Sequence, residues 1–222
     1  MRHVLSVGDV PPSTPLLEGI GEQDLEKTLL LLHSRYITFD GGDLIRNSDS
    51  ERRCAAYLVY GHADGYVYDE VGNRSILHLF MPGQMLSCGK VFGDQPVPSF
   101  DIVAREECGV LIFMTDSVPT SACKSRNLAD AVKNNVARSL AELNVELLAT
   151  LDMRLRRTIR AKLLAYLNHE RKRQGSKEFD IVYNRQELAD YLCVDRSALS
   201  RELGNLRDEG LVRYTRNHFE LL

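Results

Sequence analysis

Four polar residues lie on one face of a predicted helix near the C-terminus: Arg196, Ser197, Ser200 and Arg201. All four side chains can donate hydrogen bonds. Two arginines near the start of a helix suit the O6 and N7 acceptors of guanine in the DNA major groove. The opposite face would bury Leu199, Leu203 and Leu206, at spacings of four and three.

A second short helix and a tight turn would have to position this face. Leu188, Ala189 and Leu192 mark the apolar side of the preceding helix, and Asn184 can cap its N-terminus. Cys193-Val194 fits a break, and Asp195 can cap the helix that follows. The pattern predicts a helix-turn-helix, although an αα-hairpin with an ordinary solvated face fits the same residues.

The charge distribution supports a nucleic-acid partner. The chain has a formal net charge of −3, with 28 Lys and Arg against 31 Asp and Glu. Residues 153–222 hold 15 of the basic and 10 of the acidic residues, which leaves 13 and 21 for residues 1–152. A basic C-terminal module therefore follows an acidic one, as binding to DNA would require.

The segments around the helix-turn-helix predict a winged helix. An arginine cluster (Arg154, Arg156, Arg157, Arg160) suggests a hinge into a helix over 161–173, and residues 179–182 suggest a strand. Residues 211–214 and 219–222 would form a hairpin around 215–218, whose tip could touch the DNA backbone or be a plain surface turn.

The first half of the chain predicts an antiparallel sandwich or jelly roll. Residues 11–15 suggest a stiff extended lead-in, and residues 21–33 a short helix. Short apolar runs punctuated by glycine follow, which is typical of such folds. The expected strands lie within 36–39, 41–45, 55–60, 65–68, 75–80, 100–104 and 109–113.

A long helix is predicted between the two halves, because Ser121 to Gln174 contains neither proline nor glycine. Its apolar residues recur at spacings of three and four: Leu128, Val132, Val136, Leu140, Leu143, Leu147 and Leu151. Such a stripe suits a two-stranded dimer seam, and packing against the β domain of the same chain is the alternative. The predicted domains are 1–120, 121–152 and 153–222.

Together these motifs resemble the Crp/Fnr family of bacterial transcription regulators, along nearly the whole chain. The most specific pieces are Arg185-Gln-Glu-Leu-Ala, Arg196-Ser-Ala-Leu-Ser-Arg-Glu-Leu and Asp208-Glu-Gly-Leu-Val. The resemblance implies an α+β fold: an N-terminal β-roll of the cyclic-nucleotide-binding type, a long dimerisation helix and a C-terminal winged helix-turn-helix. It also implies a homodimer that binds a pseudo-palindromic double-stranded DNA site and contacts RNA polymerase.

The resemblance assigns roles to the DNA-facing residues. Arg185 and Gln186 would contact phosphates, which fix register and carry little sequence information. The four recognition-helix residues would read bases, and Arg201 is the best candidate for a bidentate guanine contact. Many relatives have glutamate where this chain has Ser197, so their half-site preference does not transfer.

The ligand cassette of cyclic-nucleotide-binding relatives is altered in this chain. In Pro82–Pro98, Ser87 replaces a glycine that approaches the phosphate, and Cys88 replaces the glutamate that holds the ribose hydroxyl. Val97 replaces the arginine that pairs with the cyclic phosphate, and Pro98 replaces its hydroxyl neighbour. Because a buried phosphodiester would lack its counter-charge, we expect no cyclic AMP or GMP binding.

The effector is left open by the sequence. We expect no iron–sulfur cluster, because no cysteine precedes Cys54. Haem is not the expected cofactor, because Cys88 and His78 do not match the register of haem-binding relatives, but a thiol- or haem-based redox or gas-sensing regulator stays open as the alternative. Cys88 could be a redox-sensitive thiol or a buried inert cysteine. A small, less charged or aromatic effector is the remaining hypothesis, held by a pocket that would include Gln84, Met85, Leu86, Ser87, Cys88, Val97, Lys133 and Asn134.

The sequence also argues against several other classes of protein. A cupin-type metalloenzyme would need a close His-x-His pair, which is missing, so neither a metal site nor an enzyme is expected. A β-roll ligand-binding module without DNA function is opposed by the charge distribution. No apolar run approaches the roughly 18 residues of a membrane span. With no signal peptide and five scattered cysteines, we expect a cytoplasmic protein.

Overall fold

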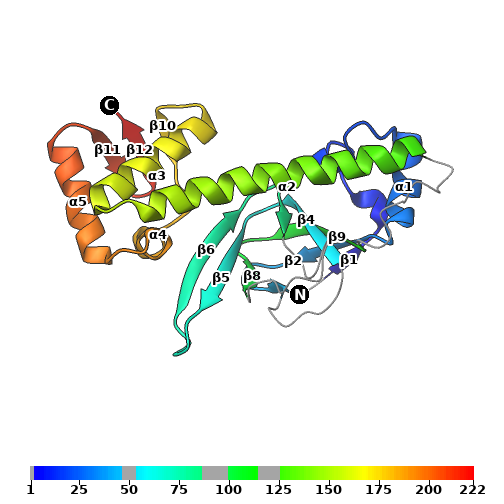
Figure 1. The fold of residues 1–222 in the computed structure, drawn as a ribbon, viewed down its shortest axis with the longest axis horizontal. Helices are drawn as coiled ribbons and strands as arrows, with labels where there is room; N and C mark the ends of the chain where they lie inside the picture. Colours follow the sequence, from blue (N-terminus) through cyan, green and yellow to red (C-terminus); the bar gives the residue numbers. More distant parts are fainter. Residues whose placement is uncertain (1–2, 47–53, 87–99, 115–125) are drawn as a thin grey trace. The chain divides into compact units, whose positions relative to one another are not determined.

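The computed structural model describes residues 3–46, 54–86, 100–114 and 126–222. The described chain divides into two compact units, Met1–Val145 and Glu146–Leu222 (Figure 1). The fold is α+β with antiparallel sheets, a long helix and a C-terminal helix-turn-helix, as predicted. None of the described helices is long and apolar enough to cross a membrane.

The N-terminal unit begins with short elements and then alternates strands. In order they are β1 His3–Leu5, the 3-10 turns η1 Val7–Asp9 and η2 Pro15–Leu17, α1 Glu22–Leu31, β2 Arg35–Phe39, β3 Leu44–Arg46, β4 Cys54–Tyr60, β5 Ala63–Tyr68, β6 Arg74–Phe80, β7 Met85–Leu86, β8 Asp101–Ala104 and β9 Cys108–Met114. The strands form two antiparallel sheets, ordered β1-β2-β9-β4-β7 and β3-β8-β5-β6. Strands distant in sequence are neighbours in both sheets, as a jelly roll requires.

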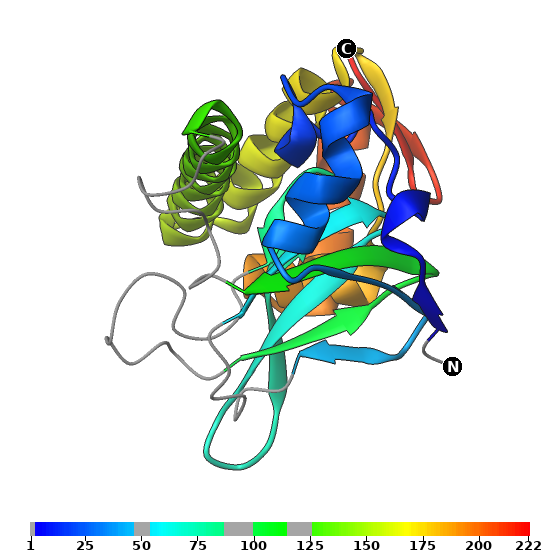
Figure 2. The ribbon, with the colours of Figure 1, turned by 90° about the vertical axis from the view of Figure 1, so that its right-hand side faces the viewer.

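The five-stranded sheet contributes residues to a core on each of its faces. Alternate residues of a strand point to opposite sides of a sheet, so neighbours in one strand can belong to different cores. On β4, Tyr57 joins one core cluster while Ala56 and Leu58 join the other. The first cluster packs α1 on the sheet through Leu29 and Leu32, and Figure 2 shows that helix in blue in front of the strands. The second cluster includes residues of both sheets, such as Leu58 and Ile102, and fills the roll.

The lead-in to this unit is a turn, contrary to the prediction that residues 11–15 are extended. The backbone N–H and Oγ1 of Thr14 both donate to the carbonyl of Pro11, at 3.0 and 2.6 Å. A threonine hydroxyl that bonds back to the main chain closes a turn, which the composition of the segment conceals. The turn brings Leu16 and Leu17 into the core.

Helix α2, Arg126–Leu155, is longer than any other described helix, and its apolar stripe is partly buried and partly exposed. Val132, Val136 and Leu143 are buried within the N-terminal unit. Leu140, Leu147 and Leu151 are 37%, 39% and 51% exposed. The alternative, packing on the β domain of the same chain, therefore holds for Val132, Val136 and Leu143, and a dimer seam along the exposed residues stays a prediction.

The C-terminal unit continues from the last turns of α2. It contains α3 Ile159–Gln174, β10 Glu178–Asp180, α4 Arg185–Leu192, α5 Arg196–Asp208, β11 Val212–Thr215 and β12 His218–Leu221. Its three strands form an antiparallel sheet ordered β10-β12-β11. Helix α3 begins two residues before the predicted helix, since Thr158 Oγ1 caps it by accepting from the N–H of Ala161 at 3.1 Å.

Candidate nucleic-acid interface

The two helices of the predicted helix-turn-helix are present and capped as the sequence indicates. Asn184 and Glu187 form a reciprocal capping box at the start of α4. Asp195 Oδ1 accepts from the N–H of Ala198 at 2.9 Å and caps α5. Cys193, with φ 53°, makes the sharp break between them. Leu188, Leu192, Leu199, Leu203 and Leu206 are fully buried, so these helices pack face to face.

The opposite face of α5 is exposed. Arg196, Ser197, Ser200 and Arg201 are all accessible on the first two turns of the helix. Ser197 Oγ donates to Asp195 Oδ1 at 2.5 Å, and this bond lowers the pKa of the Asp195 carboxyl. Within the described part of the chain, neither arginine forms a salt bridge or a hydrogen bond. Both guanidinium groups are thus available to a ligand.

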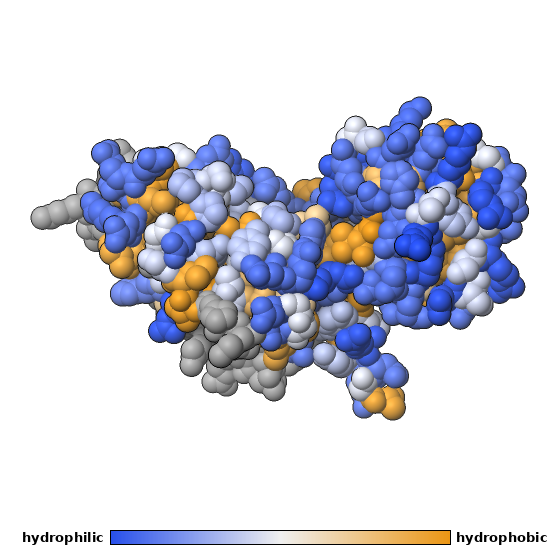
Figure 3. Space-filling view, turned by 180° about the vertical axis from the view of Figure 1, so that it is seen from behind, coloured by the Kyte–Doolittle hydropathy of each residue, from blue (hydrophilic) through white to orange (hydrophobic). Residues whose placement is uncertain are grey.

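The surface of the C-terminal unit is mostly polar on one side. The C-terminal unit is predominantly hydrophilic on the side seen in Figure 3, with small apolar patches between polar groups. Because residues 153–222 hold more basic than acidic residues, a hydrophilic surface here suits the phosphate backbone of a nucleic acid.

The two residues predicted to contact phosphate are in different environments. Gln186 is exposed, and its Nε2 donates to Asp190 Oδ1 at 2.9 Å. Arg185 is partly buried, and its guanidinium stacks on Tyr214 and Phe219 of the hairpin. Its Nη2 donates to the carbonyl of Arg216 at 2.6 Å. Of the pair, only Gln186 is presented as a surface group.

The predicted wing is a hairpin with a shorter turn than the sequence indicates. Thr215 and His218 pair with each other, so that the turn consists of Arg216 and Asn217 alone. Arg216 is exposed and has φ 53°. His218 Nδ1 lies 3.1 Å from Asp180 Oδ1, which joins the hairpin to β10. The turn carries a cation at its tip, as phosphate contact would require.

Basic residues before the helix-turn-helix have a role that sequence reasoning missed. Arg160 forms ion pairs with Glu202 and Glu209, its Nη1 lying 3.3 and 2.8 Å from their Oε1 atoms, and so holds α5. Lys162 Nζ donates to the carbonyl of Leu192 at 3.0 Å, at the C-terminal end of α4. The arginine cluster suggested only a hinge, since the distant partners of these cations are not visible in the local sequence.

The last turns of α2 also belong to this unit. Arg154 Nε donates to the carbonyl of Tyr191 at 2.8 Å, and Thr150 Oγ1 lies 3.0 Å from the Tyr191 hydroxyl. His169 Nε2 of α3 lies 3.1 Å from Glu146 Oε2. The end of the long helix is therefore fixed to the helix-turn-helix by side-chain contacts.

The His169–Glu146 pair makes the stability of this unit depend on pH. The hydrogen bond to Glu146 raises the pKa of His169 above its ordinary value of 6.5, with Glu170 adding to the effect and burial and Arg173 opposing it. A group whose pKa is higher in the folded than in the unfolded protein contributes its full stabilisation at pH values below the unfolded-state pKa. That contribution is lost as the pH rises through the folded-state pKa. We expect the free energy of unfolding to fall above about pH 6.5, by about 1 kcal/mol or less for one partly exposed pair.

Chemical denaturation of the wild type and of His169→Gln across pH 5.5–8.5 measures this effect. In His169→Gln, the free energy of unfolding should lack the fall that the wild type shows above about pH 6.5. An identical pH profile for the two proteins would contradict the assignment to His169.

The residues predicted to hold an effector are only partly within the described chain. Ser87, Cys88 and Val97 lie outside it. Met85 and Leu86 are 1% and 0% exposed and belong to the two core clusters. Gln84 Oε1 accepts from the N–H of Met81 at 3.0 Å and lies 3.4 Å from His78 Nε2. Lys133 and Asn134 are exposed on α2, and no described contact joins them to β7.

Tyr57 is a buried polar residue near this region that the sequence did not single out. It packs with Met85, Val132 and Val136, where β4 and β7 meet α2 within the N-terminal unit. Burial raises the pKa of its phenol to about 12, so the group is neutral at physiological pH. Met85, Val132 and Val136 make this wall of the roll apolar, while the charges of Arg138 and Glu142 act on the Tyr57 phenol.

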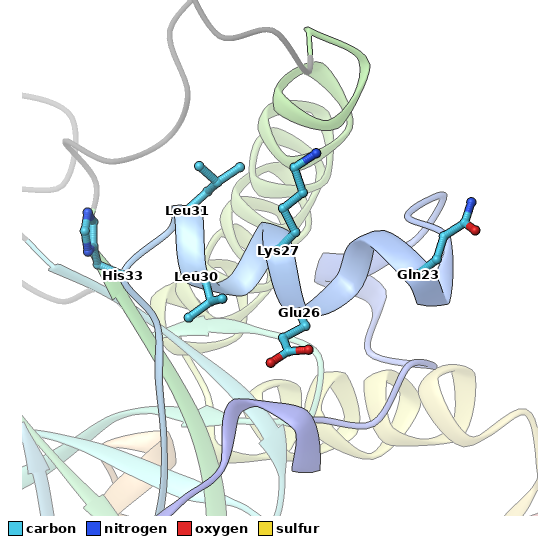
Figure 4. Close-up of a pocket in the computed structure, with 6 residues that line it drawn as sticks. All are labelled: Gln23, Glu26, Lys27, Leu30, Leu31 and His33. Carbon is cyan, nitrogen blue, oxygen red and sulfur yellow. The ribbon is translucent and has the colours of Figure 1, made fainter.

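A hollow of about 560 Å³ lies beside α1, lined by Gln23, Glu26, Lys27, Leu30, Leu31 and His33. Figure 4 shows that these side chains point in different directions from the helix and do not converge on one point. Among the described residues, no group of three or more His, Cys, Asp or Glu side chains is placed to hold a metal ion.

The geometry of the C-terminal unit is that of a winged helix-turn-helix, a DNA-binding class of domain. Residues 161–222 match the family model of the Crp-like helix-turn-helix domain. A search of curated protein sequences finds no match. The helix-turn-helix predicted from the sequence is therefore confirmed, and the αα-hairpin alternative is set aside.

The fold of the chain is shared with solved regulators. FixK2 from Bradyrhizobium japonicum is 17% identical, with a TM-score of 0.64 over 85% of this chain and 92% of its own. The c-di-GMP responsive global regulator CLP from Xanthomonas campestris is 14% identical, with a TM-score of 0.69 over 88% and 98%. A CooA mutant from Carboxydothermus hydrogenoformans is 17% identical, with a TM-score of 0.68 over 86% and 85%.

At such identities the likeness shows the fold. Together with the domain match, it confirms the similarity to Crp/Fnr regulators that the motifs predicted. The chain has the fold of a DNA-binding transcription regulator of this type.

Proposed function

We propose that the protein is a homodimeric transcription regulator that binds a pseudo-palindromic DNA site sequence-specifically and is not an enzyme. The observation that carries the proposal is the exposed first half of α5, with Arg196 and Arg201 unpaired among the described residues, in a Crp-like domain. Arg196, Ser197, Ser200 and Arg201 would read bases, and Gln186 and Arg216 would contact phosphates. A protein that reads promoters would work in the cytoplasm beside RNA polymerase, its expected partner.

The exposed side of α2 supports the homodimer. Ala137, Leu140, Asn144, Leu147 and Leu151 are all exposed at alternating spacings of three and four, the period of a two-stranded coiled coil. These residues lie beside the buried Val132, Val136 and Leu143 on the helix surface. A second copy of the same helix would bury the exposed residues, and a single asparagine within such a seam selects one register.

The N-terminal unit would sense an effector that is not a cyclic nucleotide. Support comes from Val97, which stands where relatives pair an arginine with the phosphate, and from the apolar wall around Tyr57. A small, uncharged or aromatic molecule is the proposed class. A thiol- or haem-based redox or gas sensor is the second candidate, because Cys88 lies in the replaced cassette. No cofactor is otherwise expected.

Selection of bound duplexes from a random DNA pool tests this function with the full-length protein. We expect enrichment of a pseudo-palindromic site whose half-sites lie about one helical turn apart, roughly 10 base pairs. The selection is run with and without cell extract, so that an effector can be supplied. Enrichment of no site under both conditions would favour a β-roll binding module without DNA function.

A further inference from the structure

Arg185 does not present its guanidinium as a free surface cation. Its Cζ lies 5.2 Å from the centre of the Tyr214 ring and 5.0 Å from that of Phe219, on the two strands of the wing. Nη2 donates to the Arg216 carbonyl at 2.6 Å. Nη1 is enclosed by protein atoms and has no partner among the described residues. Little of the group remains for a DNA phosphate to approach.

The wing turn needs external support because of its backbone. Arg216 has φ 53°, a left-handed conformation that is unfavourable by roughly 1–2 kcal/mol for a residue with a Cβ. Both carbonyls of the turn are bonded to other elements: that of Arg216 by Arg185, and that of Asn217 by the N–H of Ile181 at 2.9 Å. Arg185 is thus one of two anchors, and the one that comes from the helix-turn-helix itself.

We propose that Arg185 is a positioning residue, which holds the wing turn against the start of α4 so that Arg216 meets the DNA backbone in register with α5. The proposal rests on the proposed DNA-binding function. Arginine suits this role because its planar group can stack on two rings and donate to a carbonyl at once. Lysine would keep the charge and lose the stacking.

A double-mutant cycle distinguishes positioning from direct phosphate contact. Arg185→Met and Arg216→Ala should each weaken binding to the selected site by roughly tenfold, and the double variant should be no weaker than either alone, since one acts through the other. Arg185→Lys should resemble Arg185→Met. Arg213→Met, which removes an exposed arginine from the same hairpin, is the control and should bind nearly as wild type.

The salt dependence of the DNA affinity shows whether Arg185 contacts a phosphate directly instead. If Arg185 itself neutralises a phosphate, Arg185→Met will weaken binding further in the Arg216→Ala background. It will also reduce the slope of log K against log salt concentration by about two, one for each protomer of the dimer. Additive losses with that reduced slope would overturn the proposal.

Amide hydrogen exchange in the DNA-free protein tests the anchor without relying on DNA binding. The amides of residues 216–218 should exchange at least roughly fivefold faster in Arg185→Lys than in wild type, whereas those of α5 should not change. Unchanged exchange at the wing would overturn the proposal. If the wild type bound no DNA, the proposed function would fail, and the exchange result would still decide the role of Arg185.

Discussion

Arg201→Ala is expected to weaken the sequence preference of the protein sharply while leaving its fold and its non-specific DNA binding intact. Arg201 is exposed on α5 and forms no hydrogen bond or salt bridge among the described residues, so truncation removes only its electrostatic interaction with Asp195. A bidentate arginine–guanine pair contributes about 1–3 kcal/mol of discrimination, and a dimer would lose two of them. The ratio of specific to non-specific affinity should therefore fall roughly 30-fold or more.

Fluorescence anisotropy with the selected site and with a scrambled duplex measures this ratio. Arg207→Ala is the matched control, because Arg207 lies on the same helix, is also exposed and pairs with Asp208. Arg207→Ala should keep its selectivity. Undiminished selectivity in Arg201→Ala would mean that Arg201 does not read a base.

Leu147→Asp is expected to convert the protein to a monomer. Leu147 is 39% exposed on α2, so a carboxylate there can be solvated in a single chain. In the proposed seam the change would remove two buried leucines and bring two like charges together. We expect the dissociation constant of the dimer to rise by roughly a thousandfold or more.

Analytical ultracentrifugation across a concentration series measures the dimer affinity, and thermal unfolding checks that the monomer is folded. Val145→Asp is the control, since Val145 is 63% exposed on the same helix and lies outside the stripe. That variant should stay dimeric. A dimer of unchanged affinity in Leu147→Asp would place the interface elsewhere.

The helix-turn-helix could be predicted from the sequence because its determinants are local. Asn184 and Asp195 cap helices whose apolar residues lie within a few positions of them, and this part of the structure agrees with the prediction. The strands of the β-roll were located for the same reason. The turns were harder to predict from the sequence, as the turn at Thr14 and the two-residue turn of the wing show.

The long helix shows where local patterns become ambiguous. Val136 and Leu143 are buried, whereas Leu140 and Leu147 are exposed, yet all four occur at spacings of three and four. Spacing reveals an apolar helix face and does not reveal what covers it. A broad apolar stripe that is buried along one edge and exposed along the other therefore cannot be distinguished by spacing from one that is buried throughout.

The anchoring cations could not be predicted at all. Arg185 meets Tyr214 and Phe219, about thirty positions later, and Arg160 meets Glu202 and Glu209. Such pairs depend on tertiary packing, and an exposed arginine next to a phosphate has the same local sequence as a buried one under a hairpin.

The most direct test of a dimeric, sequence-specific regulator is the affinity of the full-length protein for its selected site as the spacing of the half-sites changes. Two recognition helices on one dimer require half-sites about one DNA turn apart. We predict that inserting five base pairs between them, roughly half a turn, lowers affinity to that of a single half-site, and that inserting ten restores part of it. Equal affinity at every spacing would contradict the account.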